Sequence, residues 1–314
     1  MELLIALFFG IIQGATEFLP ISGGGHLAMI QNFNQTVFGV ELFSPTLTFD
    51  ILLRLGTLLA IVFVFFSDLK RLWKELILCI KDLSRKRFSL HTNRPYRQLL
   101  YMLTVTTLFL IPAVFVMEYM ENYLSKLSVI AFTLMLTGAA NILIDTLGSK
   151  KQKQDVVSDS GELQTGEPSE KDSRKERPSA VPVADGEHPK QFLRQGAIVG
   201  AFQLASVIPG VSRCALTVMG GLVAGFRKDF TVKYAFLSAI PVLTMKILLQ
   251  TVAVLRDGIQ MDWIPYLLGM IAAFISGVLS ISLMRKAVRK NWCKRFGVYC
   301  FFIGIIILMI QIRG

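Results

Sequence analysis

Apolar residues run along most of this chain in long blocks, and polar residues gather between the blocks. Six blocks consist mostly of Leu, Ile, Val, Phe, Met and Ala over about 20 residues each, the length of helix that crosses the hydrocarbon core of a membrane. They lie near residues 48–66, 97–117, 127–147, 233–255, 263–284 and 296–313. The sequence therefore predicts an all-α polytopic membrane protein.

Two further apolar regions, near residues 3–33 and 193–226, are interrupted by Pro and Gly in their middles. Proline removes a backbone donor and breaks a helix interior, so neither region is expected to cross the membrane as one helix. Each is predicted to form a re-entrant hairpin of two half-helices that enters the membrane and returns to the same side.

The two interrupted regions share Gly, Gln and Ser at the same spacing. The shared positions are Gly10, Gln13 and Ser22 in the first region, and Gly200, Gln203 and Ser212 in the second. Each region is followed by three predicted spans, and an odd number of spans reverses the orientation of the second copy. The pattern thus predicts an inverted repeat, as in many transporter folds, with repeats at 1–148 and 192–314.

Residues 149–191 lack Phe, Trp and Tyr and are rich in Ser, Pro, Gly and charged residues. Such a stretch buries too little apolar area to offset the entropy of ordering, so we expect a disordered linker. The net charge of +11 arises from basic loops between apolar blocks, above all 67–96 and 285–295. The positive-inside rule places these loops and the linker in the cytoplasm, and the absence of a basic domain argues against nucleic-acid binding.

The first interrupted region contains QGATEFLPISGGGH, residues 13–26. Glu17 is costly at membrane depth, which marks it as a functional residue, and Gln13 lies on the same helical face one turn earlier. Glu17 could accept a proton, hold a divalent cation together with Gln13, or neutralise Arg213. The glycines at 23–25 could bring N–H groups close to an anion, and His26 beside a phosphate could be a nucleophile or a general acid–base.

The second interrupted region contains IPGVSRCALT, residues 208–217. Pro209 is expected to end one half-helix and Ser212 to cap the next, which leaves helix N–H groups without intrahelical partners. Arg213 at that N-terminus predicts a phosphate or carboxylate site, to which the Thr217 hydroxyl could add a donor. Alternatively, Arg213 snorkels to headgroups or pairs with an acid.

Other polar residues lie within the predicted spans. Asp50 and Arg54 are one turn apart and are expected to pair with each other. Lys246 could reach an interface or bind an acid. The four cysteines show no metal-ligand spacing and are expected to be free thiols.

These motifs resemble the undecaprenyl pyrophosphate phosphatases, also called bacitracin-resistance proteins. QGATEFLPISGGGH is similar to the family's glutamate-containing first motif, and PGVSRCALT is similar to its PGxSRSGxT motif. FDILLRLGTLLAIVF at 49–63 and AFLSAIP at 235–241 also fit. The resemblance implies an enzyme of the bacterial plasma membrane, with six spans and two re-entrant hairpins. It would remove the terminal phosphate of undecaprenyl diphosphate, which regenerates the lipid carrier of cell-wall synthesis, with a divalent cation such as Mg²⁺ or Ca²⁺.

The resemblance also implies roles for individual residues. It implicates Gln13, Glu17, Ser22, His26, Ser212, Arg213 and Thr217. The chain departs from the family at two places: Gly23 and Gly24 replace a serine and a threonine of the first loop, and Cys214 and Ala215 stand where Ser and Gly are usual. The replaced serine is often assigned a direct part in catalysis, so its absence leaves attack to His26 or to an activated water.

Two functions follow as hypotheses. The first is a phosphatase in which Glu17, His26, Ser212 and Arg213 are catalytic. Gln13, Ser22, the glycines at 23–25, Cys214 and Thr217 would line the substrate site, and Glu17 with Gln13 would hold the metal. The second is a catalytically degenerate relative that binds or transports a polyprenyl phosphate lipid. Lipid-facing and subunit-facing apolar surfaces have the same composition, so a homodimer stays open.

Overall fold

The computed structural model describes residues 2–27, 29–30, 46–86, 89, 94–124, 126–162, 189–257 and 263–313. Within these residues the secondary structure is helical, and no strand occurs. The helices are α1 (Glu2–Phe18), α3 (Leu47–Val64), α4 (Phe66–Ser84), α5 (Pro95–Leu124), α6 (Leu127–Glu162), α7 (Pro189–Leu204), η1 (Ala205–Val207), α8 (Arg213–Val223), α9 (Lys228–Asp257), α10 (Trp263–Arg289) and α11 (Cys293–Arg313).

Several of these helices can cross a membrane. Among the described helices, four combine sufficient length and apolar character: Leu47–Val64, Leu127–Ser149, Lys228–Arg256 and Trp263–Arg289. A helix satisfies its own backbone hydrogen bonds, which is the requirement for crossing hydrocarbon. The prediction of an all-α, multi-pass membrane protein is confirmed. The predicted spans 97–117 and 296–313 also fall inside helices, α5 and α11.

Both predicted helix breaks are present. α1 ends at Phe18, just before Pro20, and the backbone is helical again over residues 23–27. α7 ends at Leu204, and α8 begins only after Pro209 and Gly210. Gly210 has φ +86°, a left-handed conformation that strains residues with a side chain, and a Cβ there would clash with the Thr133 hydroxyl. Local sequence therefore fixes where each helix stops.

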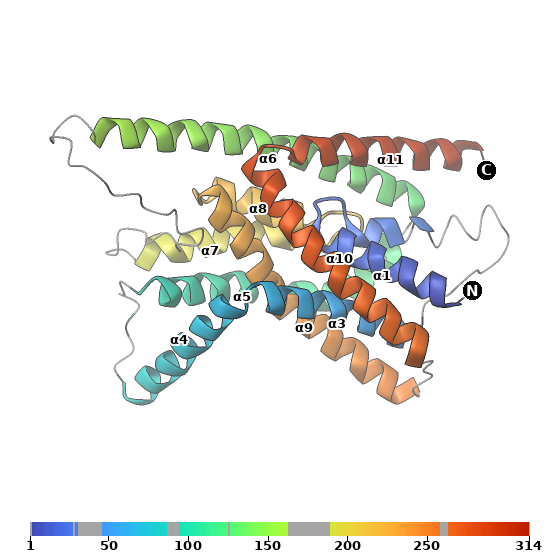
Figure 1. Ribbon diagram of the computed structural model, residues 1–314, viewed down its shortest axis with the longest axis horizontal. Coiled ribbons are helices and arrows are strands. Elements are labelled where there is room, and N and C mark those ends of the chain that lie inside the picture. Colours follow the sequence, from blue (N-terminus) through green and yellow to red (C-terminus); the bar gives the residue numbers. More distant parts are fainter. Residues whose placement is uncertain are drawn as a thin grey trace.

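The helices pack in reciprocal pairs. α1 packs against α10 as α7 packs against α5, and α3 contacts α10 as α9 contacts α5. α6 runs beside α11, at the top of Figure 1, and α3 packs against α9. α1 and α7, the first helices of the two broken regions, thus occupy corresponding places in the packing.

The contact between α1 and α10 depends on small residues. A Cβ added at Gly10 would clash with the Gly269 carbonyl oxygen and lie 2.7 Å from the Ala272 Cβ. Gly10→Val is therefore expected to force α1 away from α10 and to destabilise the fold by about 1–3 kcal/mol, as overpacking does. Thermal unfolding in detergent measures this loss against Phe8→Val, a change at an exposed position of the same helix. An equal unfolding midpoint for the two variants would contradict the close packing.

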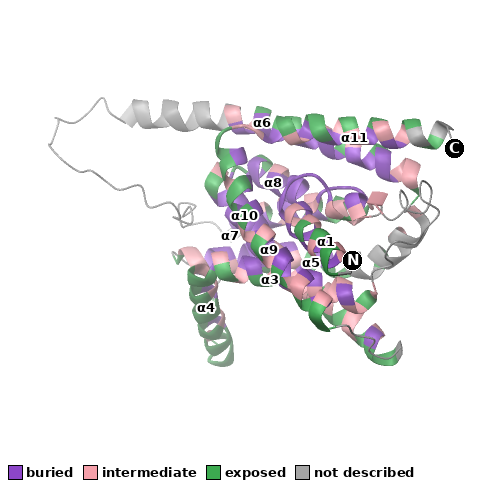
Figure 2. Ribbon diagram, turned by 45° about the vertical axis from the view of Figure 1, so that its right-hand side comes forward, coloured by how far each residue is buried: buried purple, intermediate pink, exposed green. Residues whose placement is uncertain are grey.

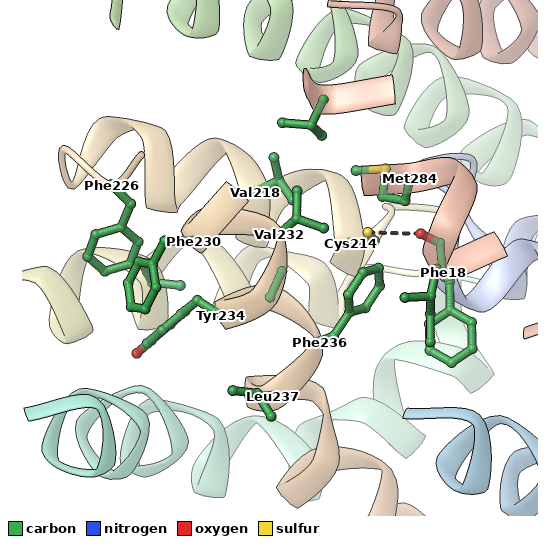
Figure 3. Close-up of a cluster of buried hydrophobic side chains, with 14 of the residues drawn as sticks. Phe18, Cys214, Val218, Phe226, Phe230, Val232, Tyr234, Phe236, Leu237 and Met284 are labelled. Carbon is green, nitrogen blue, oxygen red and sulfur yellow. Dashed lines mark hydrogen bonds between the residues drawn. The ribbon is translucent and has the colours of Figure 1, made fainter. Parts of the chain in front are cut away.

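An aromatic cluster ties the end of α1 to α9 (Figure 3). The Phe18 and Phe236 rings meet edge to face with centroids 5.5 Å apart, and both side chains are buried. Tyr234, two residues earlier on α9, is fully buried, and its hydroxyl hydrogen-bonds the Thr106 hydroxyl at 2.6 Å. This packing holds the first break against the body of the protein.

The structure corrects the prediction of a loop at 67–96, because α4 occupies most of it. The acidic face of α4 is paired: Asp68 accepts from Lys233 at 2.6 Å, and Arg97 donates to Glu75 at 3.3 Å and to Asp82 at 2.8 Å. Its other faces are largely exposed (Figure 2). The helix was missed because its apolar residues recur with a helical period among seven charged residues, so they form no continuous apolar block.

The predicted start of the linker also needs correction, because α6 continues to Glu162. Residues 149–162 contain no proline, and their Lys and Gln residues favour helix, so the helix outlasts the apolar block. Residues 163–188 lie outside the described residues, and a disordered linker there stays a prediction.

Candidate active site

A cavity of about 130 Å³ lies between the two broken regions. The first region lines it with Gln13, Glu17, Ser22, Gly23 and Gly24, and the second with Ser212 and Arg213 among others. The volume is sufficient for several water molecules, and its polar walls provide partners for them. The structure thus brings together seven of the residues that the sequence predicts for the site.

The first loop turns through Ser22. This residue has φ +70°, which is unusual for a residue with a side chain and is typical of strained functional loops. The Ser22 Oγ accepts a hydrogen bond from the Gly25 N–H at 3.3 Å, and the Ser22 carbonyl accepts from the His26 N–H at 3.2 Å. These bonds start the short helix at 23–27 with Gly23 and Gly24 at the cavity.

The second loop leads into α8 with Ser212 as its N-cap. The Ser212 Oγ accepts from the Ala215 N–H at 3.3 Å, and the Ser212 N–H donates to the Thr137 hydroxyl at 3.0 Å. The positive end of the α8 dipole therefore points toward the cavity, where it favours an anion. This is the helix N-terminus that the sequence predicts.

Buried hydrogen bonds fix the first loop. The Cys214 thiol of the second broken region donates to the Phe18 carbonyl at 3.1 Å (Figure 3), and the Asn141 amide of α6 donates to the Pro20 carbonyl at 2.6 Å. A Cβ added at Gly25 would lie 3.4 Å from the Gly210 Cα, so the backbones of the loops nearly touch. The geometry of the cavity is therefore set by contacts that link the two halves of the chain.

The charged groups of the two loops meet in the cavity. The Arg213 Nη1 lies 3.6 Å from the Glu17 Oε1, and the Gln13 amide donates to the Glu17 Oε2 at 3.3 Å. The same Nη1 is buried and has no hydrogen-bond partner among the described residues. An unpartnered buried donor is costly, so this nitrogen is well placed to bind an acceptor that enters the cavity.

A family model, described as bacitracin resistance protein BacA, matches residues 6–306 of the chain. The chain belongs to the BacA family. A protein of Methanobrevibacter smithii named undecaprenyl-diphosphatase is 30% identical over 315 residues, which cover 98% of both chains. The undecaprenyl-diphosphatase of Alkaliphilus metalliredigens is 29% identical, and 98% of each chain is covered. The undecaprenyl-diphosphatase 1 of Halalkalibacterium halodurans is 26% identical over 307 residues, which cover 96% of this chain and 94% of that protein.

Four residues that the sequence predicts for the site do not line the cavity: Gly25, His26, Cys214 and Thr217. His26 is 6% exposed, its Nδ1 lies 2.8 Å from the Ser22 carbonyl and its Nε2 lies 2.8 Å from the Tyr299 hydroxyl. A carbonyl only accepts, so Nδ1 carries a proton, and in the neutral ring Nε2 accepts from Tyr299. The ring therefore supports the Ser22 turn from behind.

The other three residues are equally engaged within the protein. The Thr217 hydroxyl donates to the Arg213 carbonyl at 2.7 Å, one turn back along α8. Cys214 and Gly25 serve the contacts between the loops described above. A Thr on a membrane helix commonly bonds its own backbone in this way, and the cavity wall does not include it.

Two charged residues of the cavity lining were missed as site residues: Arg54 of α3 and Lys246 of α9. The predicted pair of Asp50 and Arg54 is confirmed, at 2.6 Å. However, Arg54 also reaches the cavity, which its spacing from Asp50 alone could not indicate. The only signal for Lys246 in the sequence was its charge in the middle of a predicted span.

Few of the side chains that the structure describes at the cavity could bind the predicted divalent cation. The described residues contain no group of three or more His, Cys, Asp or Glu side chains that could hold a metal ion. Glu17 and Gln13 offer oxygens at the cavity, and Mg²⁺ is commonly held by one or two carboxylates together with substrate phosphates. The donor set fits a divalent cation that binds jointly with a phosphate ligand.

Proposed function

We propose that this protein is an integral membrane phosphatase that hydrolyses undecaprenyl diphosphate to undecaprenyl phosphate and inorganic phosphate. The observation that carries the proposal is the cavity in which Arg213, at the N-terminus of α8, faces Glu17 across two closely packed loops. Membership of the BacA family and the names of the relatives support hydrolysis over transport of the lipid.

A cationic side chain and backbone N–H groups would bind the substrate. The terminal phosphate would accept from the Arg213 guanidinium, from N–H groups at the start of α8, and from the backbone at Gly23 and Gly24. These donors are fixed before substrate arrives, and fixed donors stabilise the charge that develops on phosphate oxygens during transfer. Arg213 would exchange its contact with Glu17 for the phosphate.

The chemical step would be attack by water on the terminal phosphorus. Glu17 is the one carboxylate among the described residues that line the cavity, and it would take a proton from the attacking water. The new P–O bond forms as the bond to the bridging oxygen breaks, and the bridging oxygen leaves with the lipid monophosphate. A divalent cation held by Glu17 and Gln13 with the substrate would neutralise part of the diphosphate charge.

His26 would act as a positioning residue. Its ring holds the Ser22 carbonyl and is in turn held by Tyr299, so it would keep the first loop in its strained turn. The prediction that His26 attacks phosphorus would require it to leave both partners. The observed contacts favour activated water.

The finer topology is part of the proposal. Six spans and two re-entrant hairpins, in inverted repeats at 1–148 and 192–314, are supported by the reciprocal pairing of α1 with α10 and α7 with α5. We place the protein in the plasma membrane of a bacterial cell, with the segment that joins α6 to α7 in the cytoplasm. The described residues that line the cavity all belong to one chain, so the proposed site does not depend on a homodimer.

Phosphate release from a long-chain polyprenyl diphosphate tests the function. Purified protein in detergent is expected to release inorganic phosphate and to accumulate the lipid monophosphate, more rapidly with Mg²⁺ or Ca²⁺ than with a chelator. Binding of the lipid without release of phosphate in any of these conditions would overturn the phosphatase and favour a lipid-phosphate binder or transporter.

The glycines of the first loop provide a test of the water mechanism. A Cβ added at Gly24 would meet no atom within 4 Å, and one at Gly23 would lie 3.0 Å from the Thr16 hydroxyl, which must shift slightly. Gly23→Ser and Gly24→Ser add the same hydroxyl one position apart. Because water needs neither hydroxyl, both should change kcat by no more than about twofold, as expected where no interaction is lost. A large increase in kcat confined to Gly23→Ser would indicate that a serine nucleophile is missing.

A further inference from the structure

Two cationic side chains that belong to neither loop also line the cavity. Its described lining carries three cationic side chains, Arg54, Arg213 and Lys246, against one carboxylate, Glu17. Arg213 is opposed by Glu17 at 3.6 Å. Arg54 and Lys246 come from different helices, α3 and α9, and belong to neither loop. Cations inside a membrane protein are costly and are retained mainly for function.

Arg54 is held in place from the side away from the cavity. Its Nη1 contacts the Asp50 carboxylate at 2.6 Å and donates to the Gln250 Oε1 at 2.8 Å, while the Gln250 amide donates to the Asp50 Oδ2 at 3.1 Å. Neither Asp50 nor Gln250 lines the cavity. Both contacts use the same nitrogen, and guanidinium has further donors on Nε and Nη2. The three side chains therefore fix the guanidinium at the cavity wall and leave donors for a ligand.

Lys246 enters from the neighbouring helix. It lies one turn before Gln250 on α9, so the two side chains project from the same face of that helix. α3 and α9 pack against each other, and this contact brings Lys246 and Arg54 to one cavity. A flexible ammonium beside an anchored guanidinium is a combination suited to phosphate oxygens.

We propose that Arg54 and Lys246 form a second anion subsite, which takes the phosphate of the diphosphate that stays on the lipid. This inference rests on the proposed function. The loop subsite around Arg213 would hold the phosphate that leaves, and the subsite between α3 and α9 would hold its neighbour. Two subsites bind a diphosphate more strongly than a monophosphate, so the site would select the substrate and release the product after cleavage.

Inorganic pyrophosphate and inorganic phosphate are probes that need no turnover. In metal-free buffer, pyrophosphate should raise the thermal unfolding midpoint of the wild-type protein at lower concentration than phosphate. Lys246→Gln and Arg54→Gln should reduce this preference by about tenfold, the value of one charge-assisted hydrogen bond. Asp50→Asn, which removes the counter-charge of Arg54, should strengthen pyrophosphate binding. Arg256→Gln, at an exposed position near the end of α9, is the matched control.

Kinetics give a second readout. Lys246→Gln should raise KM for the polyprenyl diphosphate by about tenfold with a much smaller change in kcat, because the residue holds a group that does not react. Lys246→Arg should restore most of the loss. Some variants can unfold at a lower temperature even without ligand. For these, the ratio of pyrophosphate affinity to phosphate affinity is compared with that of the wild-type protein, because a general loss of stability leaves this ratio unchanged.

The outcomes separate the subsite from the function. Equal losses for pyrophosphate and phosphate in Lys246→Gln and Arg54→Gln would overturn the subsite, even if the wild-type protein hydrolyses the lipid. A preference for pyrophosphate that these variants abolish would support it, even if the wild-type protein shows no hydrolysis.

Discussion

Replacement of Arg213 by alanine is expected to lower diphosphate hydrolysis by about 10³-fold, the loss typical when a fixed donor to a developing oxyanion is removed. Arg213 is the cation that reaches the cavity directly from the α8 N-terminus, and its Nη1 is buried without a hydrogen-bond partner among the described residues. It is therefore poised for a ligand oxygen. The rate of phosphate release under saturating lipid measures the effect.

The control for this variant is another arginine. Arg289 donates to Asp229 at 2.9 Å on the exposed surface, and Arg289→Ala should leave hydrolysis unchanged because exposed pairs contribute little. Arg213→Lys keeps the charge but loses the bidentate donor geometry of guanidinium, so it should be more active than Arg213→Ala and less active than the wild-type protein. Near-normal turnover by a folded Arg213→Ala protein would be incompatible with the proposed site.

Replacement of Glu17 by glutamine should lower hydrolysis by about 10²–10⁴-fold, the range for loss of a general base. The substitution keeps the shape of the side chain and a hydrogen-bonding partner for Gln13, but it removes the proton acceptor. It also removes the negative charge that lies 3.6 Å from Arg213. In metal-free buffer, anion binding should therefore become stronger while catalysis fails.

Stronger anion binding together with lost turnover distinguishes a general base from a carboxylate that only maintains the structure of the site. Binding of inorganic pyrophosphate, followed by thermal unfolding, should tighten in Glu17→Gln relative to wild type. Asp229→Asn, a change at an exposed carboxylate, should alter neither binding nor turnover. If Glu17→Gln lost pyrophosphate binding and turnover together, Glu17 would be needed to build the site and its assignment as a base would fall.

Features set by local sequence could be predicted. The breaks after α1 and α7 follow from Pro20, Pro209 and Gly210, because a missing donor and a left-handed residue act within one turn. The N-cap at Ser212 and the contact between Asp50 and Arg54 are also local, and the structure contains both. Blocks of apolar residues sufficed to predict membrane-crossing helices.

Features set by contacts across the chain could not be predicted. Arg54 and Lys246 share a cavity because α3 packs against α9, and nothing in either segment specifies its partner. His26 meets Tyr299 from the far end of the sequence, and this contact turns an apparent reactive group into a support for Ser22. The helix α4 was overlooked because basic residues interrupt its apolar stripe, and its acids are matched to cations on α5 and α9.

The most direct test of the mechanism is a single-turnover experiment with polyprenyl diphosphate labelled with ³²P in the terminal phosphate. The protein is mixed in excess over the lipid and quenched at successive times, and label is followed in lipid, protein and inorganic phosphate. We expect label to pass from lipid to inorganic phosphate at the rate of lipid loss, with none on the protein, because water attacks directly. Label that accumulates on Ser22 or His26 before phosphate is released would contradict attack by water activated by Glu17.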